Sequence, residues 1–320
     1  MKLTKGKNMT KIKKILSIRA ITNLLIIAIL CIVFSIASPY FFTFSNFENI
    51  ISQSAVTILA AFAMTLIILT GGIDLSIGAV VGLSSIVIVI AINSGIPISV
   101  ACLLGIMVGL IFGSIHGIIV SKTNINPFLI TLATMNIARG IAYIITNGST
   151  IPFNNPTYAK IFSGSFLGIP VPLYIVLLCL GILSFILKKI KIGREIYAIG
   201  SNKIAAELSG INVTKVNMFT YCLAGILIGI TSIIVVGRVS SGIPSYGNGL
   251  EIEAIVAVVL GGASFTGGRG TVLGTIIGAL VIVVLTNGLT MIGVGYYAQM
   301  LIKGAVILIA VYWDSIGSNK

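Results

Sequence analysis

Acidic residues are scarce in this chain: Asp and Glu together number 7 among 320 residues, and there is 1 His. Charged residues of both signs make up 8% of the chain, whereas soluble domains carry about 25%. So few carboxylates and one histidine exclude the clustered acids, histidine sets and metal ligands on which enzyme sites are built. We therefore expect a chain that is not an enzyme, with no catalytic residue, metal or cofactor.

Cysteine is also rare, and its placement excludes two further roles. The 4 cysteines all lie inside apolar stretches, and no two of them have the C-x-x-C spacing. Neither a disulfide framework nor a metal site is indicated. We interpret them as packing residues, at Cys31, Cys102, Cys179 and Cys222.

Apolar stretches, by contrast, fill most of the chain, which is 57% hydrophobic with a mean hydropathy of +1.15. Because a helix of about 20 apolar residues crosses a bilayer core, the pattern predicts an all-α polytopic membrane protein with about ten transmembrane helices. The predicted spans are residues 20–37, 54–70, 75–92, 97–120, 127–147, 170–187, 217–236, 251–263, 271–291 and 297–313. The eighth is short, which indicates a broken or half helix. Residues 20–313 then form a single transmembrane domain between a basic segment, 1–19, and a tail, 314–320.

The net charge of +13 could suit nucleic-acid binding, but the positions of the basic residues argue against it. Seven of the 20 Lys and Arg residues lie in the first nineteen positions, and six more surround one long polar loop, 188–218. Basic residues near span ends stay in the cytoplasm. Ten spans from an inside N-terminus put sixteen basic residues inside and only Lys160 and Arg238 outside, so we expect both termini in the cytoplasm.

The N-terminus imitates a secretory signal peptide, with a basic stretch, an apolar core, and the small residues Ser35 and Ala37 placed as for cleavage. Its apolar run is longer than the usual 7–15 residues of a signal peptide. We therefore expect an uncleaved first span.

One carboxylate stands between two long apolar runs, in the stretch "TGGIDLSIG". Gly71 and Gly72 suit the end of the second span, and Asp74 suits the N-cap of the third span, at the cytoplasmic side. The alternative is that Asp74 contacts a partner protein or forms part of a pore, because ionisable residues inside membranes are mostly functional.

Glycines at every fourth position indicate close helix packing. Gly105, Gly109, Gly113 and Gly117 form a smooth face along the fourth span, and Gly274 and Gly278 repeat the spacing in the ninth. Because both blocks run from a glycine-rich turn into such a helix, the pattern also indicates a weak parallel repeat of spans two to five against spans seven to ten.

The fifth span is unusually polar. Asn136, Gly140, Tyr143 and Asn147 follow one helical stripe, and Thr131, Thr134 and Arg139 lie nearby. Two interpretations are equally supported: hydrogen bonds between helices, or a translocation path for a polar solute, with Thr131, Thr134, Asn136, Tyr143 and Asn147 as candidates.

Two basic residues, Arg139 and Lys303, and one histidine lie within predicted spans. Arg139 and Lys303 either extend toward the membrane surface or brace the bundle through carbonyl groups or an acid such as Glu251 or Glu253. Together with Asp74, they are candidate structural or gating residues. His116 stands alone, and we expect a packed, hydrogen-bonded side chain.

The long polar loop contains a second feature of interest. Ser201 or Asn202 can cap a short helix through "KIAAELS" that stops at Gly210. A short amphipathic helix between two spans suits a partner's groove, or else lies on the lipid surface.

At this point the chain resembles the membrane-spanning permease subunits of bacterial ABC importers of the ribose type. The resemblance covers almost the whole chain and rests on "SPYFFTFSNFENI", "GGIDLSIG", "TNGSTI", "GREIYAIGSNKIAAELSGINV", "AIVAVVLGGASFTGGRGTVLGTIIGAL" and "NGLTMIGV". It implies a second permease copy, two cytoplasmic ATPase subunits, an extracytoplasmic sugar-binding protein and a multi-pass location in the bacterial cell membrane. It also implies that the loop is the ATPase-coupling segment, through Ala205, Ala206, Glu207, Ser209, Gly210 and Ile211.

The resemblance further requires that the ATPase be a separate chain. The nearest approach to a phosphate-binding loop is "GASFTGGR", in which Gly268 stands where the pattern requires lysine. We therefore expect alternating access driven by partner subunits, for a sugar that the sequence does not name. The alternative is a stand-alone secondary transporter or channel, although such proteins usually carry charged relays or discontinuous helices at mid-membrane.

Overall fold

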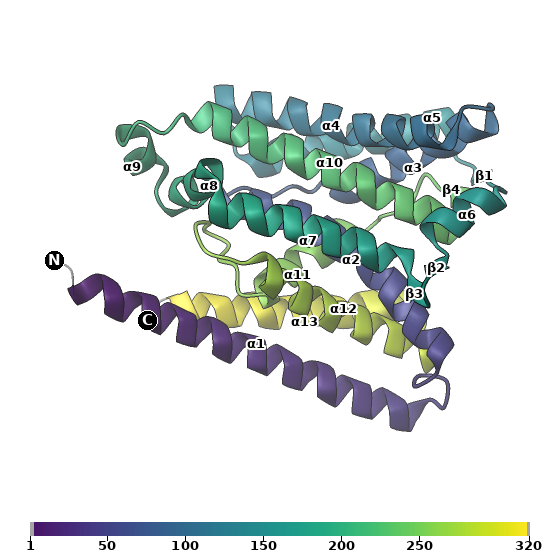
Figure 1. Cartoon of the computed structure of the whole chain (residues 1–320), viewed down its shortest axis with the longest axis horizontal. Coiled ribbons are helices and arrows are strands. Elements are labelled where there is room, and N and C mark those ends of the chain that lie inside the picture. Colours follow the sequence, from purple (N-terminus) through teal and green to yellow (C-terminus); the bar gives the residue numbers. More distant parts are fainter. Residues whose placement is uncertain (1–2, 319–320) are drawn as a thin grey trace.

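Almost all of the regular structure is helical in the computed structural model, which describes residues 3–318 (Figure 1). The outermost residues of the predicted basic segment and tail, 1–2 and 319–320, lie outside this range. The helices are α1 (Leu3–Ala37), α2 (Phe44–Leu69), α3 (Ile77–Asn93), α4 (Ile98–Lys122), α5 (Pro127–Thr146), α6 (Pro156–Phe162), α7 (Val171–Lys189), α8 (Lys191–Ser201), α9 (Lys203–Leu208), α10 (Val213–Val239), α11 (Leu250–Leu260), α12 (Val272–Met291) and α13 (Tyr296–Ser318).

Four two-residue strands join loops at one end of the bundle. They form two antiparallel pairs, β1 (Ile151–Pro152) with β4 (Ser241–Gly242) and β2 (Ser165–Phe166) with β3 (Ile169–Pro170). Beside them α6 buries Tyr158, whose hydroxyl donates to the Ile233 carbonyl at 3.0 Å. These elements fasten the α5–α7 connection to the end of α10.

Each of the ten predicted spans coincides with a helix, but the helices differ in length. By length and composition, 7 helices of the described chain can cross a membrane: α1 (over Ala20–Ala37), α2, α4, α5, α7, α10 and α12. Helix α3 has 17 residues, and α11 has only 11. The prediction of a half helix at the eighth position is confirmed, and the fold is that of an all-α polytopic membrane protein.

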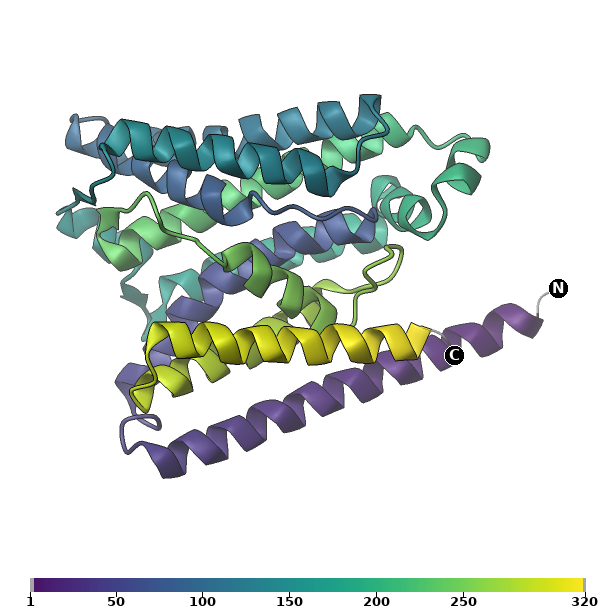
Figure 2. The same ribbon diagram turned by 180° about the vertical axis from the view of Figure 1, so that it is seen from behind.

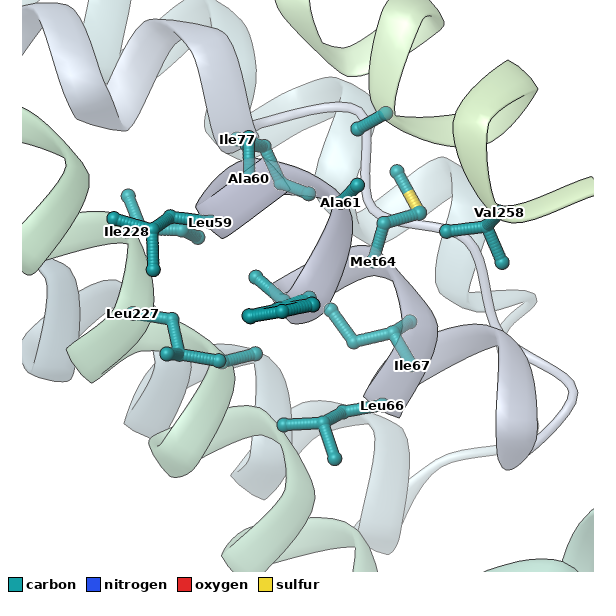
Figure 3. Close-up of a cluster of buried hydrophobic side chains, with 14 of the residues drawn as sticks. Leu59, Ala60, Ala61, Met64, Leu66, Ile67, Ile77, Leu227, Ile228 and Val258 are labelled. Carbon is teal, nitrogen blue, oxygen red and sulfur yellow. The ribbon is translucent and has the colours of Figure 1, made fainter. Parts of the chain in front are cut away.

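Helix α2 lies at the centre of the core. Its side chains from Ser54 to Leu69 are buried without interruption, which is typical of a helix surrounded by other helices. Figure 3 shows Leu59 and Leu66 beside Leu227 and Ile228 of α10, with Val258 of α11 on the other side of α2.

The glycine faces pack backbone against backbone, as predicted. On α4, a Cβ at Gly109 would collide with the Gly225 carbonyl of α10, and one at Gly113 with the Tyr221 carbonyl. On α12, a Cβ at Gly274 would collide with the Gly261 carbonyl at the end of α11. The prediction of close packing is confirmed, because only glycine permits these approaches.

The two ends of the bundle carry different structures. The start of α1, the end of α13, and helices α8 and α9 lie at one end, which we call the α8–α9 end (Figures 1 and 2). The opposite end carries α6 and the strands, and with them Lys160 of α6 and Arg238 in the last turn of α10.

The two blocks that suggested a repeat run in opposite directions. Helix α2 ends beside α8, whereas α10 begins beside α9 (Figure 1). Each long helix is followed by a non-helical stretch and then by a short helix, α3 or α11. The predicted parallel repeat is therefore wrong in direction, because a glycine pattern gives spacing but no orientation.

Candidate functional site: a buried polar seam and the α8–α9 segment

The segment that contains Asp74 is not a helix cap but an unwound stretch inside the bundle. Gly71 is left-handed at φ +85°, and the amides of Gly71 and Gly72 donate to the Ile68 and Ile67 carbonyls, which closes α2 as predicted. The chain then runs without helix to Ile77.

The N-cap of α3 is Ser76, so the predicted cap role of Asp74 is wrong by two residues. Asp74 is 1% exposed. Its Oδ1 accepts the Ser76 backbone N–H at 2.7 Å and the Ser76 hydroxyl at 2.6 Å. The carboxylate therefore folds the chain locally at the start of α3 without closing the helix itself.

The second oxygen of Asp74 faces His116 of α4. His116 Nδ1 lies 3.5 Å from Asp74 Oδ2, and His116 Nε2 lies 2.6 Å from the Thr134 hydroxyl of α5. The Thr134 hydroxyl donates to the Thr131 carbonyl at 3.1 Å, so it accepts from the ring. His116 thus lies between the Asp74 carboxylate and the Thr134 hydroxyl, and the prediction of a packed, hydrogen-bonded histidine is confirmed.

Thr131 holds the unwound segment against α5. Its hydroxyl accepts the Leu75 N–H and lies within donating distance of the Ile73 carbonyl, both at 3.2 Å. Thr131 and Thr134 are both buried. These two predicted path residues therefore form hydrogen bonds between segments of one chain.

The short helices α3 and α11 begin next to each other in the bundle interior. Gly78, in the first turn of α3, touches the Gly247 carbonyl just before α11, and a Cβ at Gly78 would also lie 2.5 Å from the Glu251 carboxylate. Gly247 and Gly249 are left-handed, at φ +80° and +84°. Glycine is required here both for the close approach and for the turn.

Arg139 of α5 binds main-chain carbonyls at this junction. Its Nη1 donates to the Pro244 carbonyl at 2.6 Å and to the Tyr246 carbonyl at 2.8 Å. The Glu251 carboxylate lies near enough to interact electrostatically. Of the two predicted alternatives, the structure has the brace and not extension toward the membrane surface.

Lys303 of α13 forms an ion pair. Its Nζ lies 2.7 Å from Glu253 Oε1, in the first turn of α11. The Lys303 and Glu253 side chains are 18% and 24% exposed. Lys303 therefore connects α13 to α11. Of its two predicted alternatives, the structure has the one in which Lys303 braces the bundle through an acid.

The remaining candidate path residues lie on the opposite face of α5. Asn136, Tyr143 and Asn147 are exposed. At Gly140, in the same stripe, an added Cβ would meet no heavy atom within 4 Å. Asn147 is the left-handed C-cap of α5. The predicted set is thus divided, with two threonines facing the interior and a polar stripe facing outward.

The predicted helix in the long loop is present as α9. Asn202 caps it by accepting the Ala205 N–H at 2.9 Å, and Gly210 follows it at φ +81°. Leu208 is 85% exposed and Ile204 is 71% exposed. Of the coupling residues, Ala206 is buried, Ile211 is half-buried, and the others are exposed, namely Ala205, Glu207, Ser209 and Gly210.

Helix α8 was not distinguished by sequence reasoning, although it carries a clear signal. Its buried residues, Gly193, Ile196 and Ile199, recur at helical spacing. At its C-terminal end Gly200 packs directly on the Leu69 carbonyl of α2 and on Gly268. Tyr197 donates to the Gly270 carbonyl at 2.9 Å, and burial raises the pKa of this phenol, which keeps the donor proton in place.

The "GASFTGGR" turn therefore contacts the chain's own helices. The Gly268 amide donates to the Leu69 carbonyl at 3.1 Å, and Gly267 and Gly268 are left-handed. Within the described residues, no group of three or more His, Cys, Asp and Glu side chains lies together. The chemistry present is hydrogen bonding and ion pairing.

Fold and polar residues together define a multi-pass helical membrane protein with two short helices that meet inside the bundle. Comparison with known proteins identifies its family: residues 46–311 match the model described as "Branched-chain amino acid transport system / permease component". The chain belongs to this family of permease components, and the resemblance to ribose-type ABC permeases is confirmed. No solved structure matches the chain.

Named relatives are similar over nearly their whole length. The chain is 45% identical over 288 residues to the ribose import permease protein RbsC of Bacillus subtilis, covering 89% of each chain. It is 40% identical to that of Haemophilus influenzae, covering 91% of this chain and 92% of the relative. It is 36% identical to the D-allose transport system permease protein AlsC of Escherichia coli, covering 92% and 91%.

Family membership confirms several expectations. The relatives are transport components and not enzymes, and they support a multi-pass protein of the inner membrane. Membership in a family of ABC importer permeases also implies ATPase and solute-binding partner proteins.

Proposed function

We propose that this permease conducts a sugar, ribose or a related monosaccharide, along a path between two copies of the chain. The observation that carries the proposal is the outward-facing polar stripe of α5, formed by Asn136, Gly140, Tyr143 and Asn147. Amide and hydroxyl groups facing lipid are unfavourable. A second copy related by twofold symmetry would enclose the stripe and provide a polar lining for sugar hydroxyls.

Ten crossings of the lipid bilayer are consistent with this arrangement. Helix α3 rises about 26 Å, and the unwound residues before it add about 16 Å, which together span a bilayer core. The half helix α11 likewise completes a crossing with the non-helical chain that precedes it. Such unwound stretches are tolerated at membrane depth because protein surrounds them.

We place the α8–α9 end, with both termini, in the cytoplasm. The start of α1, which carries basic residues, and the basic loop fall at this end, in agreement with the rule for positive charges. Lys160 and Arg238 lie at the other end.

The driving force comes from ATP hydrolysis in partner subunits. Helix α9 presents Ile204 and Leu208, exposed apolar side chains on a capped, six-residue helix, and this is the chemistry expected of an element that docks in a groove. Ala205, Ala206, Glu207, Ser209, Gly210 and Ile211 belong to this proposed coupling segment. Sugar is delivered from outside by a binding protein.

The alternative of a stand-alone transporter is not favoured. The chain contains a buried Asp74–His116 pair and two short helices that follow non-helical segments, features that such transporters usually carry. These features therefore do not discriminate between the two classes. The family match favours the permease subunit.

The test is uptake of radiolabelled D-ribose and D-allose into proteoliposomes. We expect ATP-dependent uptake when the chain is reconstituted with its ATPase and the sugar-binding protein, and none when the ATPase is omitted. Vesicles without the permease are the control. Sugar uptake by this chain alone would overturn the proposal.

A further inference from the structure

A cavity of about 400 Å³ opens near the α8–α9 end of the bundle. It lies between the end of α2, the α4–α5 connection, the α8–α9 junction and the first turns of α10. Its polar lining includes Thr70, Asn124, Asn126, Lys203, Asn217 and Tyr221. We call it the Asn217–Tyr221 cavity, after its two deepest polar residues.

Two buried polar side chains line this cavity without a protein partner. Asn217 is 6% exposed, and its amide makes no hydrogen bond to any described residue. Tyr221 is 1% exposed, and within the described chain its hydroxyl has no partner either. Native proteins rarely leave such groups unsatisfied, because burial without a hydrogen bond is costly.

Asn217 and Tyr221 line the same cavity. They are four residues apart on α10 and therefore lie on one face of the helix. The Tyr221 hydroxyl approaches the main chain of the α2–α3 segment, where it lies 2.6 Å from a Cβ position at Gly72. Asn217 and Tyr221 thus both belong to the wall of one cavity, with the Tyr221 hydroxyl enclosed by protein just beneath its surface.

The lining chemistry selects a neutral ligand. No carboxylate lines the cavity among the described residues, and its one charged residue is the exposed Lys203. Amide and phenol groups both donate and accept hydrogen bonds, as sugar hydroxyls do, and apolar neighbours such as Val120 and Ile199 can contact the carbon skeleton. The volume falls within the range of small-molecule sites, about 300–1,000 Å³.

We propose that the Asn217–Tyr221 cavity is a binding site for one small neutral polyol, such as a monosaccharide, within a single chain. It is distinct from the outward stripe of α5, because α10 and the α8–α9 junction form its wall. The ligand is either the transported sugar after release or another cytoplasmic polyol.

A regulatory consequence follows, and it rests on the proposed function. A ligand in the cavity contacts α10 together with Ile199 of α8 and Lys203 of α9. Occupancy would therefore restrain the segment that we propose to transmit force. We expect polyol on the α8–α9 side to slow ATP-driven uptake.

The binding test uses the purified full chain in lipid nanodiscs, without partner subunits. Binding of D-ribose, sorbitol and inorganic phosphate is measured by saturation-transfer NMR for the wild type, Tyr221→Phe and Asn217→Leu. Tyr158→Phe is the matched control, since it removes a buried hydroxyl that already has a partner at the opposite end of the bundle. We expect each cavity variant to weaken polyol binding about tenfold, as the loss of a hydrogen bond implies, and the control to bind as the wild type does.

Each outcome decides the proposal. Binding of ribose alone identifies the transported sugar as the ligand, and binding of both polyols identifies polyols in general. Absence of polyol binding, binding of phosphate alone, or equal binding by the variants overturns the site. Tyr221→Phe keeps the readout interpretable because it removes no protein hydrogen bond, so the variant is expected to fold. Failure of ATP-driven uptake with intact polyol binding would instead count against the proposed function.

Discussion

At the residue scale, the contact between Asp74 and His116 joins three separate segments inside the bundle. The carboxylate and the imidazole are each about 1% exposed and connect the unwound α2–α3 segment to α4. Thr134 extends the connection to α5. A buried pair of this kind stabilises little in itself, but removal of one partner leaves an uncompensated charge.

We predict that His116→Leu lowers stability by about 3–5 kcal/mol, because it leaves Asp74 with Ser76 as its only donor. The double variant Asp74→Asn/His116→Leu should recover much of this loss, since no buried charge then lacks a partner. Thermal unfolding in detergent is the measurement, with Phe112→Leu, a neighbour of the ring, as the control for packing. Additive losses in the double variant would contradict the charge argument.

Sequence reasoning identified single residues better than their partners. The left-handed Gly71, the Asn202 cap and the packed His116 follow from local rules. The partner of Asp74 lies on another helix, and the partners of Arg139 are main-chain carbonyls, which leave no side-chain signal in the sequence. The unsatisfied groups of the Asn217–Tyr221 cavity likewise become visible only once burial is known.

At the element scale, α8 connects the loop to the rest of the bundle. It contacts the end of α2 through Gly200, the α11–α12 turn through Tyr197, and the end of α7 through Gly193. Movement of the α8–α9 segment must therefore displace the end of α2. The sequence presented this element as part of a polar loop, because three basic residues precede its apolar face and a glycine interrupts it.

We predict that Gly200→Ala separates α8 from α2, because the added Cβ meets the Leu69 carbonyl and the Gly268 amide. ATP hydrolysis by the assembled complex should then continue while sugar uptake falls at least tenfold. Gly181→Ala is the matched control: it lies in α7 with no heavy atom within 4 Å, so its effect on stability should be at most about 1 kcal/mol. Normal uptake by Gly200→Ala would show that this contact does not transmit force.

At the scale of the whole molecule, the outward faces of the helices differ in polarity. Most exposed side chains of α7, and of α1 from Ala20 onward, are apolar, as at Leu178 and Ile36, which suits lipid. The outward stripe of α5 is polar and includes a glycine.

Composition predicted the class and the membrane location, whereas the direction of the repeat and the unwound stretches depend on tertiary packing that no local pattern encodes.

We predict that Gly140→Cys, in a background without the four native cysteines, forms a disulfide between two copies of the chain. The reason is that this position lies in the middle of the stripe and has open space beside it. Leu178→Cys, on the exposed apolar face of α7, should stay monomeric under the same oxidant. Non-reducing electrophoresis distinguishes the two, and cross-linking only at Leu178→Cys would place the interface on α7.

The contact between Arg139 and the chain before α11 explains how a protein so poor in acids holds a guanidinium inside its bundle. Two peptide oxygens, those of Pro244 and Tyr246, accept its hydrogen bonds, and the Glu251 carboxylate lies near enough to interact electrostatically. Because Arg139 binds main-chain oxygens, the contact depends on the backbone conformation and not on the identity of the side chains. A substitution that leaves the backbone conformation unchanged preserves the contact, whereas deletion of one residue between Ile243 and Gly247 removes it.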